Sequence, residues 1–236
     1  DQMALFKRIA LFFLLCAAVV PAIAQIKTDV GISFGVGIPQ AEFGDNLDNL
    51  GFGIQLNGAI GIRGIPISVG ADFDFMIYGH ERRNEPFSQT IPDVTVKVVT
   101  DNNLIAGHFF LRLQPDQFRI RPYADALIGF KHLYTDTKIT NEGFEEQEIA
   151  RSTNFDDTAL SYGFGAGLQI QVYVSPEDSE SSMDVSLDFG LKYLLGSEAS
   201  YLKEGSIRRE NGQVTFDVKQ SKTTLLLPYV GVVLSF

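Results

Sequence analysis

Apolar residues recur at every second position in eight stretches of the chain, and each stretch is about as long as one β-strand. In the first stretch Val30, Ile32 and Phe34 alternate with glycine and serine. A period of two is typical of strands whose two faces meet different surroundings. The pattern therefore predicts strands at residues 30–38, 52–63, 67–77, 104–113, 121–134, 160–174, 183–194 and 225–236.

The connections between these strands alternate between short and long. Short connections follow the second, fourth and sixth strands, as in the segment RGIP at 63–66. Longer ones begin near Pro39, Gly79, Thr137 and Gly196. Short turns at one rim and long loops at the other, with both termini at the short-turn rim, are typical of outer-membrane barrels. The prediction is an all-β fold, an eight-stranded antiparallel up-and-down transmembrane β-barrel.

The two faces of the predicted strands differ in size as well as polarity. One face carries Phe, Leu and Ile, and the other carries mostly Gly, Ser, Ala, Asn, Gln and Asp. An eight-stranded barrel has an interior just wide enough for side chains, so small polar residues suit its lumen and bulky apolar ones suit lipid. Alternation alone leaves a second possibility open, which is a soluble periplasmic barrel that binds an apolar ligand inside.

Composition and the first residues point to export. The chain has 236 residues and a net charge of -10, and such an acidic chain has no excess of Lys and Arg for binding nucleic acid. Lys7 and Arg8 precede a short apolar run that ends in Ala22-Ile23-Ala24. This arrangement is typical of a signal peptide cleaved before Gln25. We therefore expect a signal peptide at 1–24 and a barrel domain at 25–236, located in the outer membrane of a Gram-negative bacterium.

The final strand has an aromatic last residue and apolar residues at alternate positions before it. These are Val230, Val232, Leu234 and Phe236. They resemble the assembly signal that the barrel-insertion machinery recognises. Residues 25–236 as a whole resemble the small outer-membrane β-barrel family common in Bacteroidetes, which includes PorT-like proteins, and more distantly the OmpA/OmpX type. The Gly-rich first strand VGISFGVGIP and the eight-strand rhythm carry this resemblance, together with the signal peptide and Phe236.

The resemblance implies a structural or interaction role, such as membrane integrity, adhesion or support for a secretion assembly. Outer-membrane lipid and lipopolysaccharide are then the expected surroundings, and the outer loops are the expected contact for a protein partner. An alternative is a narrow pore for small solutes or ions.

Charged residues on the polar faces form a predicted lumen cluster of five acids and four bases. Its members are Arg63, Asp72, Asp74, Arg112, Asp125, Lys131, Asp184, Asp188 and Lys192. One interpretation is a plug of ion pairs that holds a narrow interior together. The other is an ion or proton path, because Asp72, Asp125 and Asp188 fall at similar counts from their strand ends and could form an acidic ring.

Catalytic, cofactor and metal sites are not expected. The histidines are His80, His108 and His132. His132 is followed by Leu133-Tyr134, so the His-x-Ser pattern of lipid A deacylase barrels is absent, and no GxSxG motif occurs. A nucleophile needs a neighbouring base, and the sequence shows no such pair.

Three further features concern the predicted outer rim. The acidic segment from Glu142 to Asp157 is interpreted as a solvated loop, or as a binder of divalent cations that bridge lipopolysaccharide. Asn211-Gly212 predicts a two-residue hairpin turn, so the last two strands should project as one hairpin that could capture a partner strand. An aromatic girdle is predicted from Tyr78, Tyr134, Tyr162 and Tyr193.

Overall fold

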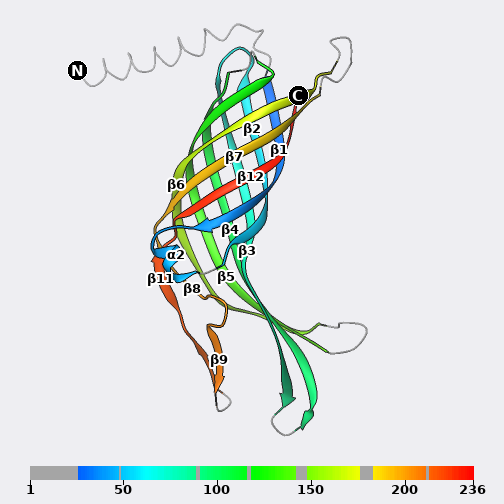
Figure 1. Cartoon of the computed structure of the whole chain (residues 1–236), viewed down its shortest axis with the longest axis vertical. Coiled ribbons are helices and arrows are strands. Elements are labelled where there is room, and N and C mark those ends of the chain that lie inside the picture. Colours follow the sequence, from blue (N-terminus) through cyan, green and yellow to red (C-terminus); the bar gives the residue numbers. More distant parts are fainter. Residues whose placement is uncertain are drawn as a thin grey trace, which may run out of the picture.

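Eight strands close into one antiparallel barrel in the computed structural model, which describes residues 26–47, 49–88, 91–115, 118–141, 148–175, 183–210 and 213–236. The order around the ring is β1-β12-β7-β6-β5-β4-β3-β2 (Figure 1). The barrel strands are β1 (Ile26–Pro39), β2 (Gly51–Ile62), β3 (Ile67–Ser88), β4 (Ile91–Leu113), β5 (Ile120–Asn141), β6 (Glu148–Tyr173), β7 (Asp184–Gly196) and β12 (Leu225–Ser235). The predicted up-and-down barrel is confirmed. The predicted signal peptide and its cleavage site at Ala22, Ala24 and Gln25 lie outside the described residues.

The first and last strands close the ring. Val30 pairs with Leu234 and Ile32 pairs with Val232, while Thr28 and Phe236 exchange two backbone hydrogen bonds. The β1–β12 ladder is interrupted opposite Pro228, because proline has no N–H to donate. Within the wall of the ring each barrel strand has a paired neighbour on both sides, which is the arrangement that hydrocarbon surroundings require.

The bulky apolar face points outward. Phe109 is 74% exposed and Phe164 is 63% exposed on the outside of the wall. Charged and amide side chains are buried inside, among them Asp72, Gln55 and Lys131. The alternative of a soluble barrel with an apolar interior is therefore wrong, because the phase of the alternation places the large apolar groups outside. Among the described residues no helix has the length and apolarity needed to cross a membrane.

Four neighbouring strands are much longer than the other four. β3, β4, β5 and β6 have 22, 23, 22 and 26 residues, whereas β1, β2, β7 and β12 have 14, 12, 13 and 11. About 9–11 residues are enough for a strand to span a bilayer. The additional residues continue as a paired sheet, which Figure 1 shows projecting from the end opposite the C-terminus. We call this end the outer mouth.

This projecting sheet corrects the prediction of long loops near Gly79 and Thr137. Arg82 pairs with Val99, and Lys138 pairs with Arg151, well beyond the predicted strand ends. The segment from Thr95 to Thr100 is rich in β-branched residues, which favour extended backbone. The part of the predicted acidic loop from Glu148 to Asp157 is likewise strand β6, and 142–147 lie outside the described residues.

The segment between β7 and β12 is a folded cap. It contains two short ladders, β8 (Glu198–Tyr201) with β11 (Lys219–Lys222) and β9 (Ile207–Glu210) with β10 (Gln213–Phe216). The prediction of one uninterrupted hairpin is wrong, because a turn closed by a hydrogen bond from Ser206 N to Lys203 O separates the two ladders. In that turn Gly205 adopts a φ of 76°, which glycine tolerates best. Asn211-Gly212 lies outside the described residues.

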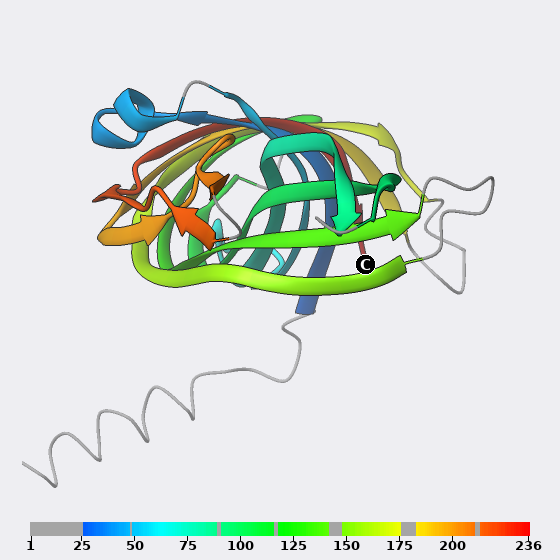
Figure 2. The same cartoon turned by 90° about the horizontal axis from the view of Figure 1, so that it is seen from below.

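Figure 2 looks at the barrel from its outer mouth and shows the short strands of the cap and the helix after β1 on the same side of the opening. Buried apolar side chains form an apolar plug in the outer mouth. Tyr201 and Leu202 are 1% and 0% exposed, and Tyr201 meets Phe43 of α2 (Glu42–Asn46) edge-on at 5.1 Å between ring centroids. Tyr78 and Asn102 both donate hydrogen bonds to the carbonyl of Leu202. The prediction that Tyr78 belongs to the girdle is wrong, because Ile77 points outward and its neighbour therefore points inward.

Candidate functional site

The centre of the lumen is an ion cluster built from β3 and β7. Asp72 and Asp74 are two residues apart on β3, so both carboxylates point inward. Lys192 of β7 lies across the lumen, with Nζ 2.9 Å from Asp72 Oδ2 and 3.3 Å from Asp74 Oδ1. All three side chains are buried. One ammonium group thus compensates two carboxylates that would otherwise repel each other at close range.

His108 of β4 connects this cluster to β6. Its Nδ1 lies 3.1 Å from Asp72 Oδ1, and its Nε2 lies 2.8 Å from the hydroxyl of Ser161. A carboxylate only accepts hydrogen bonds, so Nδ1–H donates to Asp72, and in a neutral imidazole Nε2 is then the acceptor for the hydroxyl of Ser161. Asp72 therefore receives hydrogen bonds from both Lys192 and His108.

A second ion pair lies nearer the short-turn rim. Arg112 Nε and Nη2 each donate to one oxygen of Asp125 at 2.8 Å, which is the bidentate geometry of strong Arg–carboxylate pairs. The guanidinium carbon of Arg112 lies 4.0 Å from the centroid of the Tyr123 ring. Both charges are buried, and the aromatic face adds a cation–π contact.

Asp188 is bound by tyrosine. The hydroxyl of Tyr123 donates to Asp188 Oδ1 at 2.8 Å, and the hydroxyl of Tyr229 lies 2.6 Å from that of Tyr123. Asp72, Asp125 and Asp188 thus each face a donor of their own. This arrangement does not match an open acidic ring, and it agrees with the interpretation of a hydrogen-bonded plug.

The other predicted members of the cluster lie at its ends. Lys131 is fully buried and donates to the carbonyls of Leu194 and Thr223 at 3.0 and 2.5 Å, which joins β5 to β7 and to the segment that precedes β12. Asp184 is half-buried at the short-turn rim and accepts from Gln171 at 2.9 Å. The prediction that Arg63 faces the lumen is wrong. Arg63 is exposed in the β2–β3 turn, because β2 and its alternation end at Ile62.

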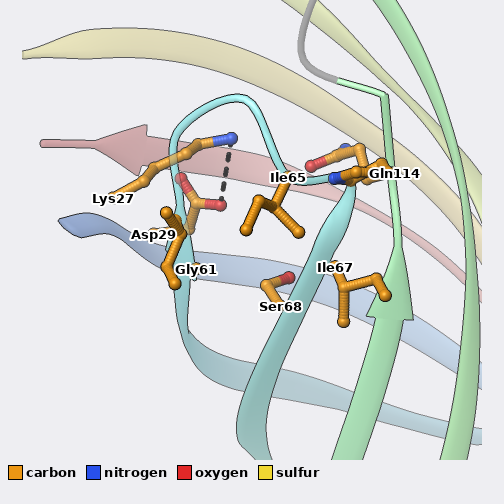
Figure 3. A pocket seen from close by; sticks show the side chains of 9 residues that line it. Lys27, Asp29, Gly61, Ile65, Ile67, Ser68 and Gln114 are labelled. Atoms are coloured by element: carbon orange, nitrogen blue, oxygen red, sulfur yellow. Dashed lines mark ion pairs between the residues drawn. The ribbon is translucent and has the colours of Figure 1, made fainter. Parts of the chain in front are cut away.

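A small hollow lies at the short-turn rim, beside the start of β1 and the β2–β3 turn. Figure 3 shows Lys27 and Asp29 of β1 beside this hollow, with their charged groups 3.5 Å apart. Ser68 and Gln114 line the same cavity, whose volume of about 10 Å³ is roughly that of one water molecule. This hollow leaves room for a single water, and the outer mouth is packed with apolar side chains.

Two groups of residues in the central cluster resemble sites that bind metals or catalyse reactions. Asp72, Asp74 and His108 bring three donor atoms within 4.8 Å of one another, a ligand set that transition metals accept. The ammonium group of Lys192 occupies the position of a cation between the two carboxylates. Ser161, His108 and Asp72 are ordered like a nucleophile, its base and an orienting acid. Because Ser161 is 0% exposed, an acyl substrate has no surface to approach, and we assign the arrangement a structural role.

Sequence reasoning missed several uncharged or rim-proximal members of the lumen. Arg121 donates to Ser186 at 2.9 Å, and Gln114 donates to Gln169 at 2.9 Å. Arg121 and Tyr123 are in phase with Asp125 within the predicted strand 121–134, so following the alternation back to the start of that strand would have identified them. The pairing of Ser161 with His108 had no such signal, because strand register determines it.

The predicted outward residues of the last strand keep their phase. Val230, Val232 and Phe236 are exposed on the outside, and Leu234 is half-buried. Their role as an assembly signal stays a prediction. Tyr162 and Tyr193 lie on the outer face beside Phe164, whose ring centroid is 5.9 Å from that of Tyr193.

Comparison with solved structures gives outer membrane proteins of low sequence identity. Ail, the attachment invasion locus protein of Yersinia pestis, solved with the heparin analogue sucrose octasulfate, is 15% identical; the alignment covers 90% of this chain and 99% of Ail, with a TM-score of 0.44. Neisserial surface protein A is 12% identical, with coverages of 89% and 95% and a TM-score of 0.35. A major outer membrane protein from Thermus thermophilus is 11% identical, with coverages of 89% and 99% and a TM-score of 0.39.

Comparison with protein families gives a match over most of the chain. The family described as outer membrane protein beta-barrel domain matches residues 9–218. A comparison with curated proteins found no match.

Proposed function

The chain belongs to the outer membrane protein β-barrel family, and from this premise we propose that it is a non-enzymatic barrel that acts through the sheet projecting from its outer mouth. The protein is located in the outer membrane, and lipid and lipopolysaccharide surround it there. The proposed role is to hold a partner protein, as in adhesion or in support of a secretion assembly.

The filled lumen supports an interaction role over passage of solutes. Tyr201 and Leu202 close the outer mouth, and the ion pairs of Lys192 and Arg112 cross the middle. Breaking a buried ion pair is costly, because it leaves an uncompensated charge in a medium of low dielectric constant. A narrow pore, the alternative function, would need both layers to open.

The edge of β6 beyond its ladder with β7 is the observation that carries the proposal. β6 pairs with β7 only from Ser161 onward, where Ser161 lies opposite Gly196. From Glu148 to Asp156 the described ladders pair β6 with β5 alone. An unpaired edge presents backbone N–H and C=O groups that can accept another extended strand. Ile149, which is half exposed at this edge, adds an apolar contact for an incoming strand.

The opposite edge of the projecting sheet is covered by the cap. Glu81 of β3 accepts a hydrogen bond from Gly205 N at 3.1 Å, and Arg83 donates to the carbonyl of Ile207 at 3.0 Å. The cap also reaches the base of the β6 edge, where Ser200 N donates to Asp157. Partner binding is therefore proposed for the β6 edge from Glu148 to Asp156, and not for the hairpin between the last two strands.

Three narrower points belong to the same proposal. Export follows a signal peptide at 1–24 that is cleaved before Gln25. The insertion machinery recognises the last strand through Val230, Val232, Leu234 and Phe236, whose outward phase in β12 supports this role. A place among PorT-like barrels of Bacteroidetes is supported by the Gly-rich strand VGISFGVGIP.

A proline scan of the β6 edge tests the proposal. The mature barrel is placed in lipid nanodiscs and its binding to reduced, carboxymethylated α-lactalbumin, a permanently unfolded chain, is measured against native α-lactalbumin. Ser152→Pro and Thr153→Pro are compared, because neighbouring N–H groups on a strand point to opposite sides. We expect the unfolded chain to bind, and the proline that removes the outward N–H to abolish binding.

The mobility shift on heating in a detergent gel shows in each case that the variant has folded. Equal binding by the wild type and both folded proline variants would contradict the use of this edge, as would a wild type that does not discriminate unfolded from native α-lactalbumin. Binding to immobilised heparin is measured separately. Binding to heparin without binding to the unfolded chain would indicate a surface that binds polyanions, and it would contradict strand addition.

A further inference from the structure

A hollow of about 530 Å³ opens on the outside of the barrel wall where β2 begins. The β2–β3 ladder ends at the pair Phe52–Ile77, and β3 continues past it into the projecting sheet. The hollow thus lies at the step between the complete wall and the sheet, beside the cap. Its lining residues are Asn49, Leu50, Phe52, Ile77, Tyr78, Gly79, His80 and Glu204.

The floor of the hollow is apolar and continues the lipid-facing surface. Leu50, Phe52 and Ile77 are 47%, 52% and 38% exposed. The next outward residues along the two strands, Ile54 and Phe75, pair with each other on the same face. A lipid chain that lies against the wall can therefore enter the hollow without leaving apolar surroundings.

The rim of the hollow is polar and contains both donors and acceptors. Asn49 Nδ2 donates to Glu204 Oε2 at 2.7 Å. His80 bonds to Asp101 through Nδ1 and accepts a hydrogen bond from Arg82 Nε at 2.8 Å. All of these contacts are exposed to solvent, so their groups can exchange water for a ligand at little cost.

We propose that this hollow binds one outer-leaflet glycolipid, with an acyl chain on the floor and an uncharged sugar head group at the rim. Sugar hydroxyls both donate and accept hydrogen bonds, so they complement the carboxylate of Glu204 and the amide of Asn49 together. A phosphate head group only accepts, so it cannot donate to the carboxylate of Glu204, whose negative charge would also repel it. The volume of the hollow lies within the range of about 300–1,000 Å³ typical of small-molecule sites.

Photo-crosslinking tests the site with defined lipids. The mature barrel is placed in phosphatidylcholine nanodiscs with a trace of glucosyl diacylglycerol that carries a diazirine in one acyl chain, and labelled residues are mapped by mass spectrometry. We expect saturable labelling at Leu50, Phe52 and Ile77. Unlabelled glucosyl diacylglycerol should compete, and phosphatidylglycerol should not.

Variants separate the site from general lipid contact. Glu204→Ala should lower the affinity about tenfold, since it removes a charged acceptor. Phe52→Ala should reduce labelling in the hollow, whereas Phe109→Ala, an exposed position on β4 outside the hollow, should leave it unchanged. Labelling that does not saturate, or that Glu204→Ala leaves unchanged in a barrel shown to be folded by its gel shift, would overturn the proposal. Equal competition by phosphatidylglycerol would overturn the choice of a sugar head group.

Discussion

At the scale of single residues, the lumen shows how charges can be buried in a narrow barrel. Lys192 is shared by Asp72 and Asp74, and His108 donates to Asp72 from the other side. Several contacts to each charge offset the cost of removing it from water. The stability of the barrel should therefore depend steeply on the few cations in its interior.

Lys192→Met tests this dependence. The substitution keeps the length of the side chain but leaves two neighbouring carboxylates without their ammonium partner, and we expect a loss of about 3–5 kcal/mol in the free energy of unfolding. Urea unfolding in lipid vesicles, followed by circular dichroism because the chain has no tryptophan, measures it.

The matched control is Lys219→Met. Lys219 pairs with Asp217 at 3.1 Å on the exposed cap, where an ion pair contributes about 0–1 kcal/mol. A Lys192→Met variant no less stable than this control would contradict the central ion cluster. The triple variant with Asp72→Asn and Asp74→Asn should recover part of the loss, since it removes the repelling charges.

The Ser161–His108–Asp72 arrangement gives a second prediction at this scale. A fluorophosphonate probe reacts with an activated serine, but Ser161 has no exposed surface in the folded barrel. We expect the probe to leave folded protein unlabelled and Ser161→Ala to retain the heat-dependent gel shift. Stoichiometric labelling of folded wild type, lost in Ser161→Ala, would show instead that the site is reachable and reactive.

At the scale of elements, the period of two was sufficient to predict all eight barrel strands and the outward placement of their bulky residues. It did not predict the parts of β3 to β6 that form the projecting sheet. Polar residues such as Asn102 and Asn103 interrupt the alternation there, while both faces of the projecting sheet lose the contrast between lipid and lumen. The lumen position predicted for Arg63 was wrong for the opposite reason, because the alternation was extended past the end of β2.

The side-chain contacts across the lumen could also not be predicted from the sequence. Counting along strands gives which residues point inward, and eight of the nine predicted members do lie in the lumen or at its rim. Contact between Lys192 and Asp72 depends on their positions across the barrel, which follow from the register of all eight strands. A single sequence carries no signal for that register.

Hydrogen exchange tests the corrected strand lengths. Val98 and Thr100 belong to the ladders that β4 forms with both β3 and β5, so we expect their amides to exchange as slowly as the amide of Leu104 within the barrel wall. Mass spectrometry of exchanged peptides in nanodiscs measures this. Fast exchange at 96–102, comparable to that of the exposed turn at Arg63-Gly64, would restore the loop that the sequence suggested.

At the scale of the whole molecule, the barrel has an interior packed with buried side chains, and the binding that we propose takes place on its exterior. The closed ring and its apolar outer face suit the outer membrane, to which the family match assigns the chain. Ion pairs occupy the middle of the lumen and an apolar plug occupies the outer mouth. Among the described residues, the two surfaces that we propose for binding lie outside the ring, on the edge of β6 and in the hollow beside Phe52.

The central claim is that the lumen holds the barrel together and that function lies outside it. Conductance across a planar bilayer tests this most directly, with the gel shift on heating used to show that the inserted protein is folded. The account predicts that folded wild-type protein gives no stable single-channel steps at neutral pH, because the plug and the Lys192 and Arg112 ion pairs block the path in series. Reproducible channel openings by the folded wild type, altered by Asp72→Asn or Asp188→Asn, would contradict the account and make the protein a pore.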